Sequence, residues 1–278
     1  MPGLEIAWRK AATALAPLAF DRSAQVAQLL LAHVLQVERA HLFAYPLQTL
    51  SAAQQLAYDA ILLRHQQGEP LSYILGEVEF FSNSFLVNKQ VLIPRPETEL
   101  LVEQAIAQLA AHECPTILDL GTGSGAIAVS LAKALPAAHI LAIDKSEAAL
   151  SVARMNAARH DCLDVQFICS DWFCAVPLQQ FDCIVSNPPY VSLADWQATP
   201  SLHYEPVSAF IGGTDGLDAY QAIAAKARHY LTREGVLLLE HGSLQADAVR
   251  DILQQEGYSD IFSVHDLSGH VRITCASR

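Results

Sequence analysis

Residues Thr116 to Ala126 read TILDLGTGSGA and join a strand-like segment to a glycine-rich turn. Residues 116–120 form a short apolar run of strand length, and residues 124–135 are alanine-rich and have the composition of a helix. Glycines between a strand and a helix let the backbone turn sharply and let a ligand approach the N–H groups at the helix start. The stretch therefore predicts a ligand-binding loop at the carboxyl end of a strand.

The glycine pattern leaves the ligand open between two classes. Gly121, Gly123 and Ala126 fit the G-x-G-x-x-A pattern of dinucleotide-binding proteins. Gly121, Gly123 and Gly125 also fit the looser G-x-G-x-G pattern of S-adenosylmethionine (SAM) enzymes. Asp144 ends the next predicted strand, and its carboxylate can accept hydrogen bonds from both hydroxyls of a ribose in either case. A glycine-rich turn without a ligand is the structural alternative.

A second motif, Asn187-Pro188-Pro189-Tyr190, follows the fourth predicted strand and favours SAM. Loops at the carboxyl ends of parallel strands form the ligand crevice of open α/β sheets. The prolines stiffen the backbone, so the Asn187 side-chain oxygen and the Pro188 carbonyl can both accept from one planar NH2 group. The Tyr190 ring can stack on that group. A rigid turn anchored by the tyrosine is the structural alternative, but a hydride-transfer site has no use for this loop.

Strands and helices alternate from Glu97 onward, which predicts an α/β fold with a mostly parallel sheet and helices on both faces. Strands are expected at residues 116–120, 139–144, 165–169, 182–186, 236–240, 261–265 and 271–276, and helices at 124–135, 146–158, 214–231 and 244–256. The last two strands are joined by residues 266–270. Because a parallel crossover needs a dozen residues or more, this pair must be antiparallel.

The first 75 residues have no clear strand pattern and predict a small helical bundle. Helices are expected from Ser23, as N-cap, to Leu35 and from Ser51 to about His65. Residues 78–81 and 85–87 are rich in β-formers and predict a hairpin, and the following Ile-Pro-Arg-Pro segment is stiff. We therefore expect three parts: a bundle at 1–75, a hairpin and linker at 76–96, and a catalytic domain at 97–278.

The composition excludes several classes of protein. Apolar residues make up 52% of the 278 residues and charged residues only 17%, which excludes a disordered chain. No apolar run approaches about 18 residues and no secretory signal is visible, so we expect a cytoplasmic protein without a membrane span. The net charge of −12 argues against stable binding of nucleic acid. None of the six cysteines forms a C-x-x-C pair, which predicts neither a zinc site nor a disulfide.

Together these motifs resemble the class I SAM-dependent methyltransferases that modify planar nitrogens. More narrowly, the chain is similar to the HemK/PrmC family of peptide chain release factor glutamine N5-methyltransferases. The similarity extends over most of the chain beyond the first 65 residues. Its motifs lie at residues 70–76 (PLSYILG), 92–99 (LIPRPETE), 170–173 (SDWF), 204–206 (YEP), 212–217 (GGTDGL), 239–242 (LEHG) and 267–272 (LSGHVR).

The resemblance implies a fold, a reaction and a set of site residues. The fold would be a seven-stranded, Rossmann-like class I methyltransferase domain whose last strand is antiparallel, preceded by an all-α bundle and a β-hairpin linker. The methyl group of SAM would pass to the glutamine N5 of the Gly-Gly-Gln motif in class 1 release factors, leaving S-adenosylhomocysteine. SAM would be bound by Gly121, Thr122, Gly123, Ser124, Gly125, Asp144, Asp171, Trp172 and Asn187. The glutamine would be bound by Asn187, Pro188, Pro189 and Tyr190, of which Asn187, Pro188 and Tyr190 would be catalytic.

Other interpretations stay open at this stage. The acceptor can be a ribosomal-protein glutamine or an exocyclic amine of a nucleic-acid base, and a SAM-binding scaffold without activity is the non-enzymatic alternative. Arg95 can hold a carboxylate at the domain junction or touch the substrate, Glu205 can order the loop after the Asn-Pro-Pro-Tyr motif or contact the release factor, and His241 is expected to be structural. We expect no metal and a monomer.

Overall fold

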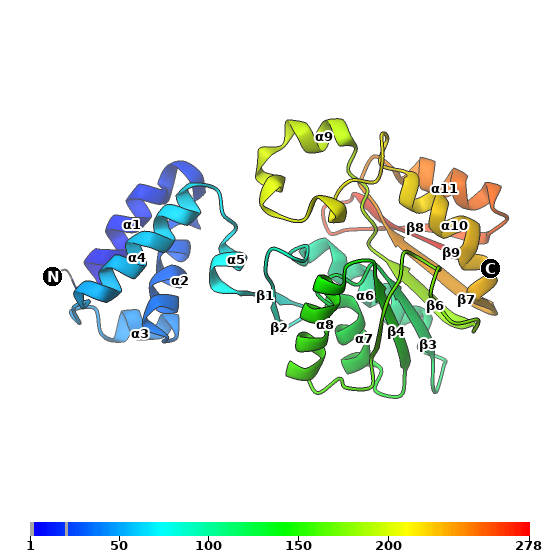
Figure 1. The fold of residues 1–278 in the computed structure, drawn as a ribbon, viewed down its shortest axis with the longest axis horizontal. Coiled ribbons are helices and arrows are strands. Elements are labelled where there is room, and N and C mark those ends of the chain that lie inside the picture. The colour runs from blue at the N-terminus through cyan, green and yellow to red at the C-terminus, as the bar shows by residue number, and fades with distance from the viewer. Residues whose placement is uncertain (1–2, 20–21) are drawn as a thin grey trace. The chain divides into compact units, whose positions relative to one another are not determined.

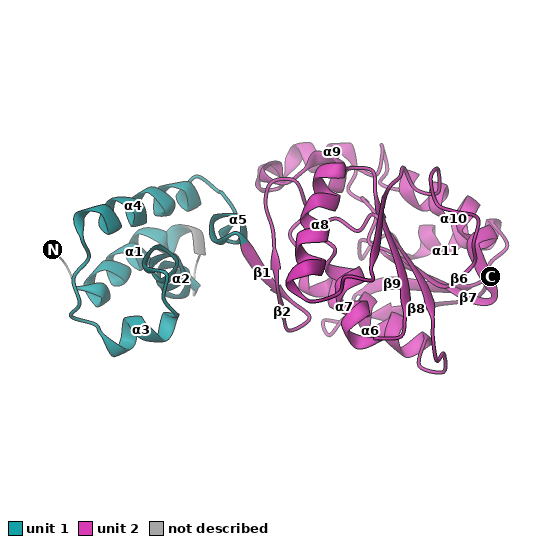
Figure 2. Cartoon of the chain, turned by 60° about the horizontal axis from the view of Figure 1, so that its bottom comes forward, with its two compact units in different colours: residues 1–76 teal, residues 77–278 magenta. Residues whose placement is uncertain are grey.

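The structure is a computed structural model that describes residues 3–19 and 22–278. The chain divides into two compact units, residues 1–76 and 77–278 (Figure 2). Residues 77–96, predicted as a hairpin and linker between two domains, are part of the second unit. Each unit has hydrophobic core clusters of its own.

The first unit is a bundle of short helices. Its helices are α1 (Leu4–Ala19), α2 (Ser23–Leu35), α3 (Arg39–Ala44), α4 (Ala52–Gln66) and α5 (Leu71–Leu75). Leucines and the Tyr58 ring fill its core, and the Tyr58 hydroxyl donates to the Ala27 carbonyl at 2.8 Å. Ser51 caps α4 with a reciprocal capping box through Gln54, as its position predicts. The prediction for Ser23 was wrong: Ser23 lies inside α2, because the chain enters the helix at Arg22.

The second unit is built on a seven-stranded sheet (Figure 1). Its strands are β3 (Thr116–Leu120), β4 (His139–Asp144), β5 (Gln166–Cys169), β6 (Phe181–Ser186), β7 (Leu231–Glu240), β8 (Ser259–His265) and β9 (Val271–Ser277). They lie in the order β5-β4-β3-β6-β7-β9-β8, and β9 is antiparallel to both neighbours. This confirms the predicted fold class and the antiparallel final pair. The strand order reverses between β3 and β6, so the loops after these two strands meet at one edge of the sheet.

Helices cover both faces of this sheet (Figure 1). Apolar side chains of α6 (Glu99–Gln108), α7 (Ala126–Ala134) and the end of α8 (Glu147–Arg159) pack on one face. Those of α10 (Asp218–Tyr230) and α11 (Ala246–Gln255) pack on the other. The predicted helix over residues 214–231 begins only at Asp218, because residues 212–217 form a loop at the edge of the site.

A long excursion between β6 and α10 carries α9 (Leu193–Ala198). Its two ends are pinned together, since the Val191 N–H donates to the Phe210 carbonyl at 2.7 Å and the Gly212 N–H donates to the Val191 carbonyl at 3.0 Å. The excursion is therefore closed at its base.

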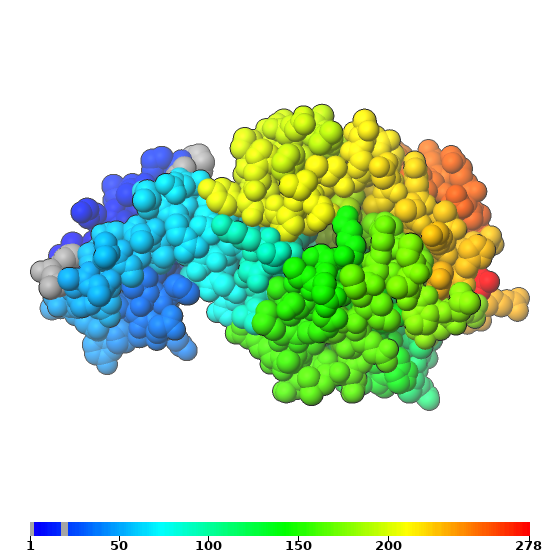
Figure 3. Space-filling view, viewed as in Figure 1, coloured from blue at the N-terminus to red at the C-terminus, as the bar shows by residue number. Residues whose placement is uncertain are grey.

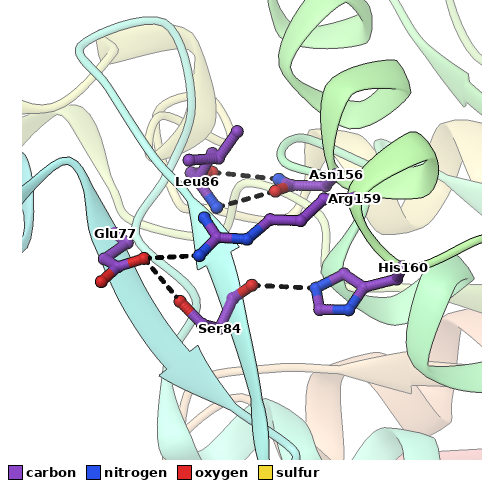
Figure 4. Close-up of polar contacts among 6 residues, drawn as sticks. All are labelled: Glu77, Ser84, Leu86, Asn156, Arg159 and His160. Atoms are coloured by element: carbon purple, nitrogen blue, oxygen red, sulfur yellow. Dashed lines mark hydrogen bonds and ion pairs between the residues drawn. The ribbon is translucent and has the colours of Figure 1, made fainter.

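The hairpin of β1 (Glu77–Phe80) and β2 (Asn83–Leu86) is fastened to α8 (Figure 4). The Asn156 side chain accepts a hydrogen bond from the Leu86 N–H at 2.7 Å and donates one to the Leu86 carbonyl at 3.0 Å. Arg159 forms an ion pair with Glu77 at 2.8 Å. Two hairpin aromatics, Phe80 and Phe85, are buried in the core under α6. The hairpin thereby holds residues 90–92, which follow it, against the pocket described next.

Candidate active site

A pocket of about 690 Å³, part of it open to solvent, lies at the carboxyl ends of the parallel strands. On the face drawn in Figure 3, the second unit is hollowed between its yellow segments near residue 205 and its green segments near residue 145. Seven of the predicted site residues line it: Gly121, Gly123, Asp144, Asp171, Trp172, Asn187 and Pro189.

The other five predicted residues adjoin the pocket without being among those that line it. The Thr122 hydroxyl donates to Asp119 at 2.6 Å, and the Ser124 carbonyl accepts from the Asn156 side chain at 2.8 Å. Gly125 is the N-cap of α7, where its φ of +80° starts the helix. The remaining two, Pro188 and Tyr190, lie in the same loop, directly next to the lining residues Asn187 and Pro189.

The glycine loop presents bare backbone to the pocket. Gly123 has a φ of +55°, which disfavours any side chain, and a Cβ built there would meet nothing within 4 Å. The Gly123 N–H donates to one carboxylate oxygen of Asp144 at 3.0 Å, and the Ser146 N–H donates to the other at 2.8 Å. The arrangement fits a ligand that lies against the loop and offers hydroxyl groups to Asp144.

Two carboxyl groups lie close together beneath this loop. Burial raises the pKa of Asp144, against the hydrogen bonds from Ser146 and Gly123. Asp119 is fully buried, and burial raises its pKa to about 7. One Asp119 oxygen accepts from Thr122, and the other has no hydrogen-bond partner among the described residues. Burying Asp119 with one oxygen unpaired therefore costs folding free energy.

An aromatic ring lies beside the glycine loop and lines the same pocket. Trp172 has a φ of +46°, and its carbonyl is held by the Ser170 hydroxyl at 2.7 Å. A Cβ placed on Gly121 would be 3.9 Å from the Trp172 ring, which is an ordinary van der Waals contact. The ring can cover the flat face of a heterocycle.

The loop after β6 is held by its neighbours. Gln245 donates to the Tyr190 carbonyl at 3.0 Å and accepts from the Gly242 N–H at 3.0 Å, joining two loops. A Cβ on Gly216 would approach the Tyr190 carbonyl oxygen to 2.2 Å, so a third loop packs here with no room for a side chain. Asn187 donates its side-chain N–H to Thr98 at 3.0 Å. The backbone that follows β6 is thereby fixed in place.

Two residues whose roles were left open have structural ones. The Arg95 guanidinium pairs with the Glu205 carboxylate at 2.5 Å, and the other Glu205 oxygen accepts from the Ile93 N–H at 2.9 Å. Arg95 thus holds a carboxylate, as one of its two interpretations expected, although both residues lie within the second unit; the ordering role of Glu205 is confirmed. His241 is buried and contacts the Thr274 hydroxyl at 2.9 Å, and burial lowers its pKa. Its structural interpretation is confirmed.

Sequence reasoning missed some residues at the site. Residues 90–92, Ser208 and Ala209 also line the pocket, and nothing in their types marks them. Thr98 accepts a hydrogen bond from Asn187, and Glu240 takes the neighbouring position on the next strand. A signal for Glu240 was present, because a carboxyl group directly follows the apolar run of residues 236–239 at the end of β7.

Comparison with known proteins agrees with this fold and pocket. Residues 7–76 match the family described as "PrmC N-terminal domain", and residues 96–201 match "Methyltransferase small domain". A release factor glutamine methyltransferase of Coxiella burnetii is 44% identical over 91% of this chain and 91% of its own, and one of Salmonella typhimurium is 41% identical over 92% of each. A methyltransferase structure from Pyrococcus furiosus, 16% identical, covers 79% of this chain and 98% of its own with a TM-score of 0.53, and shows the fold alone.

The sheet order and the match to the methyltransferase small domain give the second unit the fold of a class I methyltransferase. The sequence identity of 44% and 41% to the two relatives, over about nine tenths of each, narrows this class to one family. The chain belongs to the release factor glutamine methyltransferase family.

Some other features of the described residues complete the site's surroundings. Within residues 3–19 and 22–278, no group of three or more His, Cys, Asp or Glu residues is placed to hold a metal ion. No helix in these ranges is both long and apolar enough to cross a membrane. The six cysteines are all unpaired.

Proposed function

We propose that this protein transfers the methyl group of SAM to the side-chain amide nitrogen of the glutamine in the Gly-Gly-Gln motif of class 1 release factors. The observation that carries the proposal is the placement of Asn187. Asn187 lines the pocket together with residues of the glycine loop, and its side-chain nitrogen is already bound to the buried Thr98. The names of the relatives support the choice of substrate.

The pocket fits SAM on its own chemistry. Gly121 and Gly123 would let the cofactor lie against the backbone, and Asp144 would accept hydrogen bonds from its ribose hydroxyls. Trp172 would cover the adenine, with Asp171 as an acceptor from its amino group. When bound, SAM supplies an electrophilic methyl group.

The loop after β6 would hold the acceptor amide. An amide nitrogen is a weak nucleophile because its lone pair is delocalised. Hydrogen bonds from its N–H groups to the Asn187 oxygen and the Pro188 carbonyl would raise its electron density and fix its line of attack. Holding the reacting atoms about 3–3.5 Å apart removes a large share of the barrier. Burial raises the pKa of Tyr190 to about 12, so its hydroxyl stays neutral and the ring serves as a stacking surface.

The proposal is tested by methylation assays with tritiated SAM and purified release factor, ribosomes and DNA. We expect label in release factor alone. Label in ribosomes or DNA would support the ribosomal-protein or nucleic-acid alternative, and no label anywhere would favour a scaffold. Asn187→Ala should lose most transfer, with a barrier increase of about 2.7–4 kcal/mol by analogy with oxyanion donors, while SAM affinity stays within a few-fold. Near-normal transfer by this variant would contradict the assignment.

We also propose that the first unit recognises the release factor. A short acceptor loop buries too little surface for a stable complex, which usually needs about 1,200–2,000 Å². A protein that begins near Leu75 should still fold and bind SAM, because the pocket lies wholly in the second unit. It should methylate intact release factor poorly, whereas a Gly-Gly-Gln peptide should be an equally weak substrate of both proteins. Equal activity on intact release factor would show that the bundle is a stabilising cap instead.

A further inference from the structure

Three polar side chains from distant parts of the sequence meet behind the pocket wall. Asn187 follows the last residue of β6, and Glu240 is the last residue of β7. Because Ser186 pairs with Leu239 in the parallel ladder, Asn187 and Glu240 take the next positions on neighbouring strands. Thr98 stands at the start of α6. Thr98 is 4% exposed and Glu240 is 2% exposed, so both are shielded from water.

The hydroxyl of Thr98 binds Asn187. Thr98 ends the 3-10 turn Pro96–Thr98, which runs directly into α6, and its own backbone is already helical, with φ −70° and ψ −18°. The side chain makes no hydrogen bond to the helix, and its oxygen accepts from the Asn187 nitrogen at 3.0 Å. The turn and α6 thus place a hydroxyl group against Asn187.

Glu240 lies beside this contact, at the neighbouring position of the ladder. The Thr98 and Asn187 side chains lower the pKa of its carboxyl group, against the larger effect of burial. Asn187 therefore has one hydrogen-bonded acceptor on its inner side, the Thr98 hydroxyl, and a carboxyl group close enough to take its second Nδ2 hydrogen after a small adjustment. The opposite corner of the planar amide is Oδ1. This orientation leaves the oxygen for the pocket, where a substrate NH2 group needs an acceptor.

We propose that Thr98 and Glu240 are positioning residues that lock the Asn187 amide with its nitrogen inward, so that the pocket accepts an amide NH2 and rejects a carboxylate at the same place. This inference rests on the proposed function and extends it to the choice between glutamine and glutamate. If Asn187 turned over, its NH2 group would face the substrate NH2, donor against donor. Its oxygen would meanwhile face the Glu240 carboxyl group.

The lock holds in either charge state of Glu240. Burial raises the pKa of Glu240 to about 7, and among its charged neighbours Glu97 raises it while Arg272 lowers it. A neutral carboxyl group still has a carbonyl oxygen that accepts from Asn187. One carboxyl oxygen, Oε2, is buried without a hydrogen-bond partner among the described residues. Burial of this carboxyl group beside Asn187 costs folding free energy, which is typical of a group that serves function rather than stability.

The first experiment compares Thr98→Val, Glu240→Met and Thr98→Ser in the full chain. Thr98→Val and Glu240→Met remove an acceptor at nearly constant volume, and Thr98→Ser keeps the hydroxyl. We expect kcat for release factor to fall about tenfold or more in the first two, with SAM affinity within about threefold, and to recover in Thr98→Ser. Asp182→Asn is a matched control, because this carboxylate binds Thr116 at the opposite end of β6. It should keep the wild-type kcat.

A second readout separates positioning from loss of structure. Release factor carrying glutamate in place of the acceptor glutamine should bind wild type at least about tenfold more weakly than the glutamine form, because Oδ1 faces its carboxylate. In Thr98→Val and Glu240→Met this ratio should shrink toward one, since Asn187 can then turn its NH2 outward. A merely structural defect would weaken both forms equally.

A third readout needs no substrate. The side-chain NH2 of Asn187, identified in 15N spectra by its loss in Asn187→Ala, should exchange slowly in wild type and faster in Thr98→Val. Wild type that methylates no release factor would refute the proposed function, while this exchange measurement would still test the lock. Unchanged kcat, an unchanged glutamine-to-glutamate ratio, or unchanged NH2 exchange in Thr98→Val would each overturn the inference.

Discussion

Replacing Glu205 and Glu147 by alanine gives a sharp test of how burial sets the strength of an ion pair in this protein. Both glutamates form an ion pair with an arginine at 2.5 Å, Glu205 with Arg95 and Glu147 with Arg154. Their surroundings differ greatly. The side chain of Glu205 is 4% exposed and that of Glu147 is 63% exposed. Glu205 also accepts from the Ile93 N–H at 2.9 Å.

The expected magnitudes follow from these surroundings. Removing one partner of a buried pair costs about 3–5 kcal/mol. The Arg95 side chain is 35% exposed and can regain water, so Glu205→Ala should cost about 3 kcal/mol, the lower end of that range. An exposed pair contributes about 0–1 kcal/mol, which is the expectation for Glu147→Ala.

Urea unfolding followed by tryptophan fluorescence measures both variants, with Trp172 and Trp196 reporting from the second unit. For a slope of about 2 kcal/mol per molar urea, the midpoint should fall by about 1.5 M in Glu205→Ala and by less than about 0.5 M in Glu147→Ala. SAM affinity should also fall in Glu205→Ala, because its neighbours Pro206 and Leu92 line the pocket. Equal midpoint shifts in the two variants would refute the reasoning from burial.

Three further outcomes are expected. Asp144→Ala should weaken SAM binding by about 1.5–3 kcal/mol in isothermal titration, since charge-assisted hydrogen bonds are lost, and unchanged affinity would make Asp144 a purely structural residue. Asn156→Ala should lower the free energy of unfolding by about 2–4 kcal/mol in urea, because it removes three hydrogen bonds of a buried side chain, two to Leu86 and one to Ser124; a loss under 1 kcal/mol would contradict this. Glu240→Gln should be more stable than wild type by up to about 3 kcal/mol at pH 8 and equally stable below about pH 4.5. The reason is that folding raises the pKa of Glu240 from 4.5 to about 7, so the stability of wild type declines as the pH rises through that interval. Urea midpoints of both proteins at pH 4.5 and pH 8 test this.

Much of the second unit could be predicted from the sequence, because its signals are local. The strand, turn and helix at residues 116–134 follow from an apolar run, glycines and alanines in succession. Ser146 caps α8 through the Ala149 N–H at 3.2 Å, as its residue type suggests. Both motifs at the carboxyl edge were found for the same reason.

Other features depend on contacts between distant residues, which local patterns do not encode. Glu99 in the Pro-Glu-Thr-Glu segment accepts from the Phe81 N–H at 2.8 Å, so the hairpin belongs to the second unit rather than to a separate linker. Helix α6 was not singled out, since its residues look like any amphipathic stretch. The role of Thr98 beside Asn187 joins positions 89 residues apart and is visible only in the fold.

The hydrogen bonds that join the two ends of the excursion at residues 191–212 affect which changes of sequence and length this segment can tolerate. Since Val191 and Gly212 hold the two ends together, the segment from Ser192 to Tyr204 can lengthen, shorten or change its surface while the ends stay in register. Loop-closure entropy grows only slowly with length, so such changes cost little stability. Evolution, or an engineer, can therefore change the surface of this segment without displacing the residues after it that line the pocket.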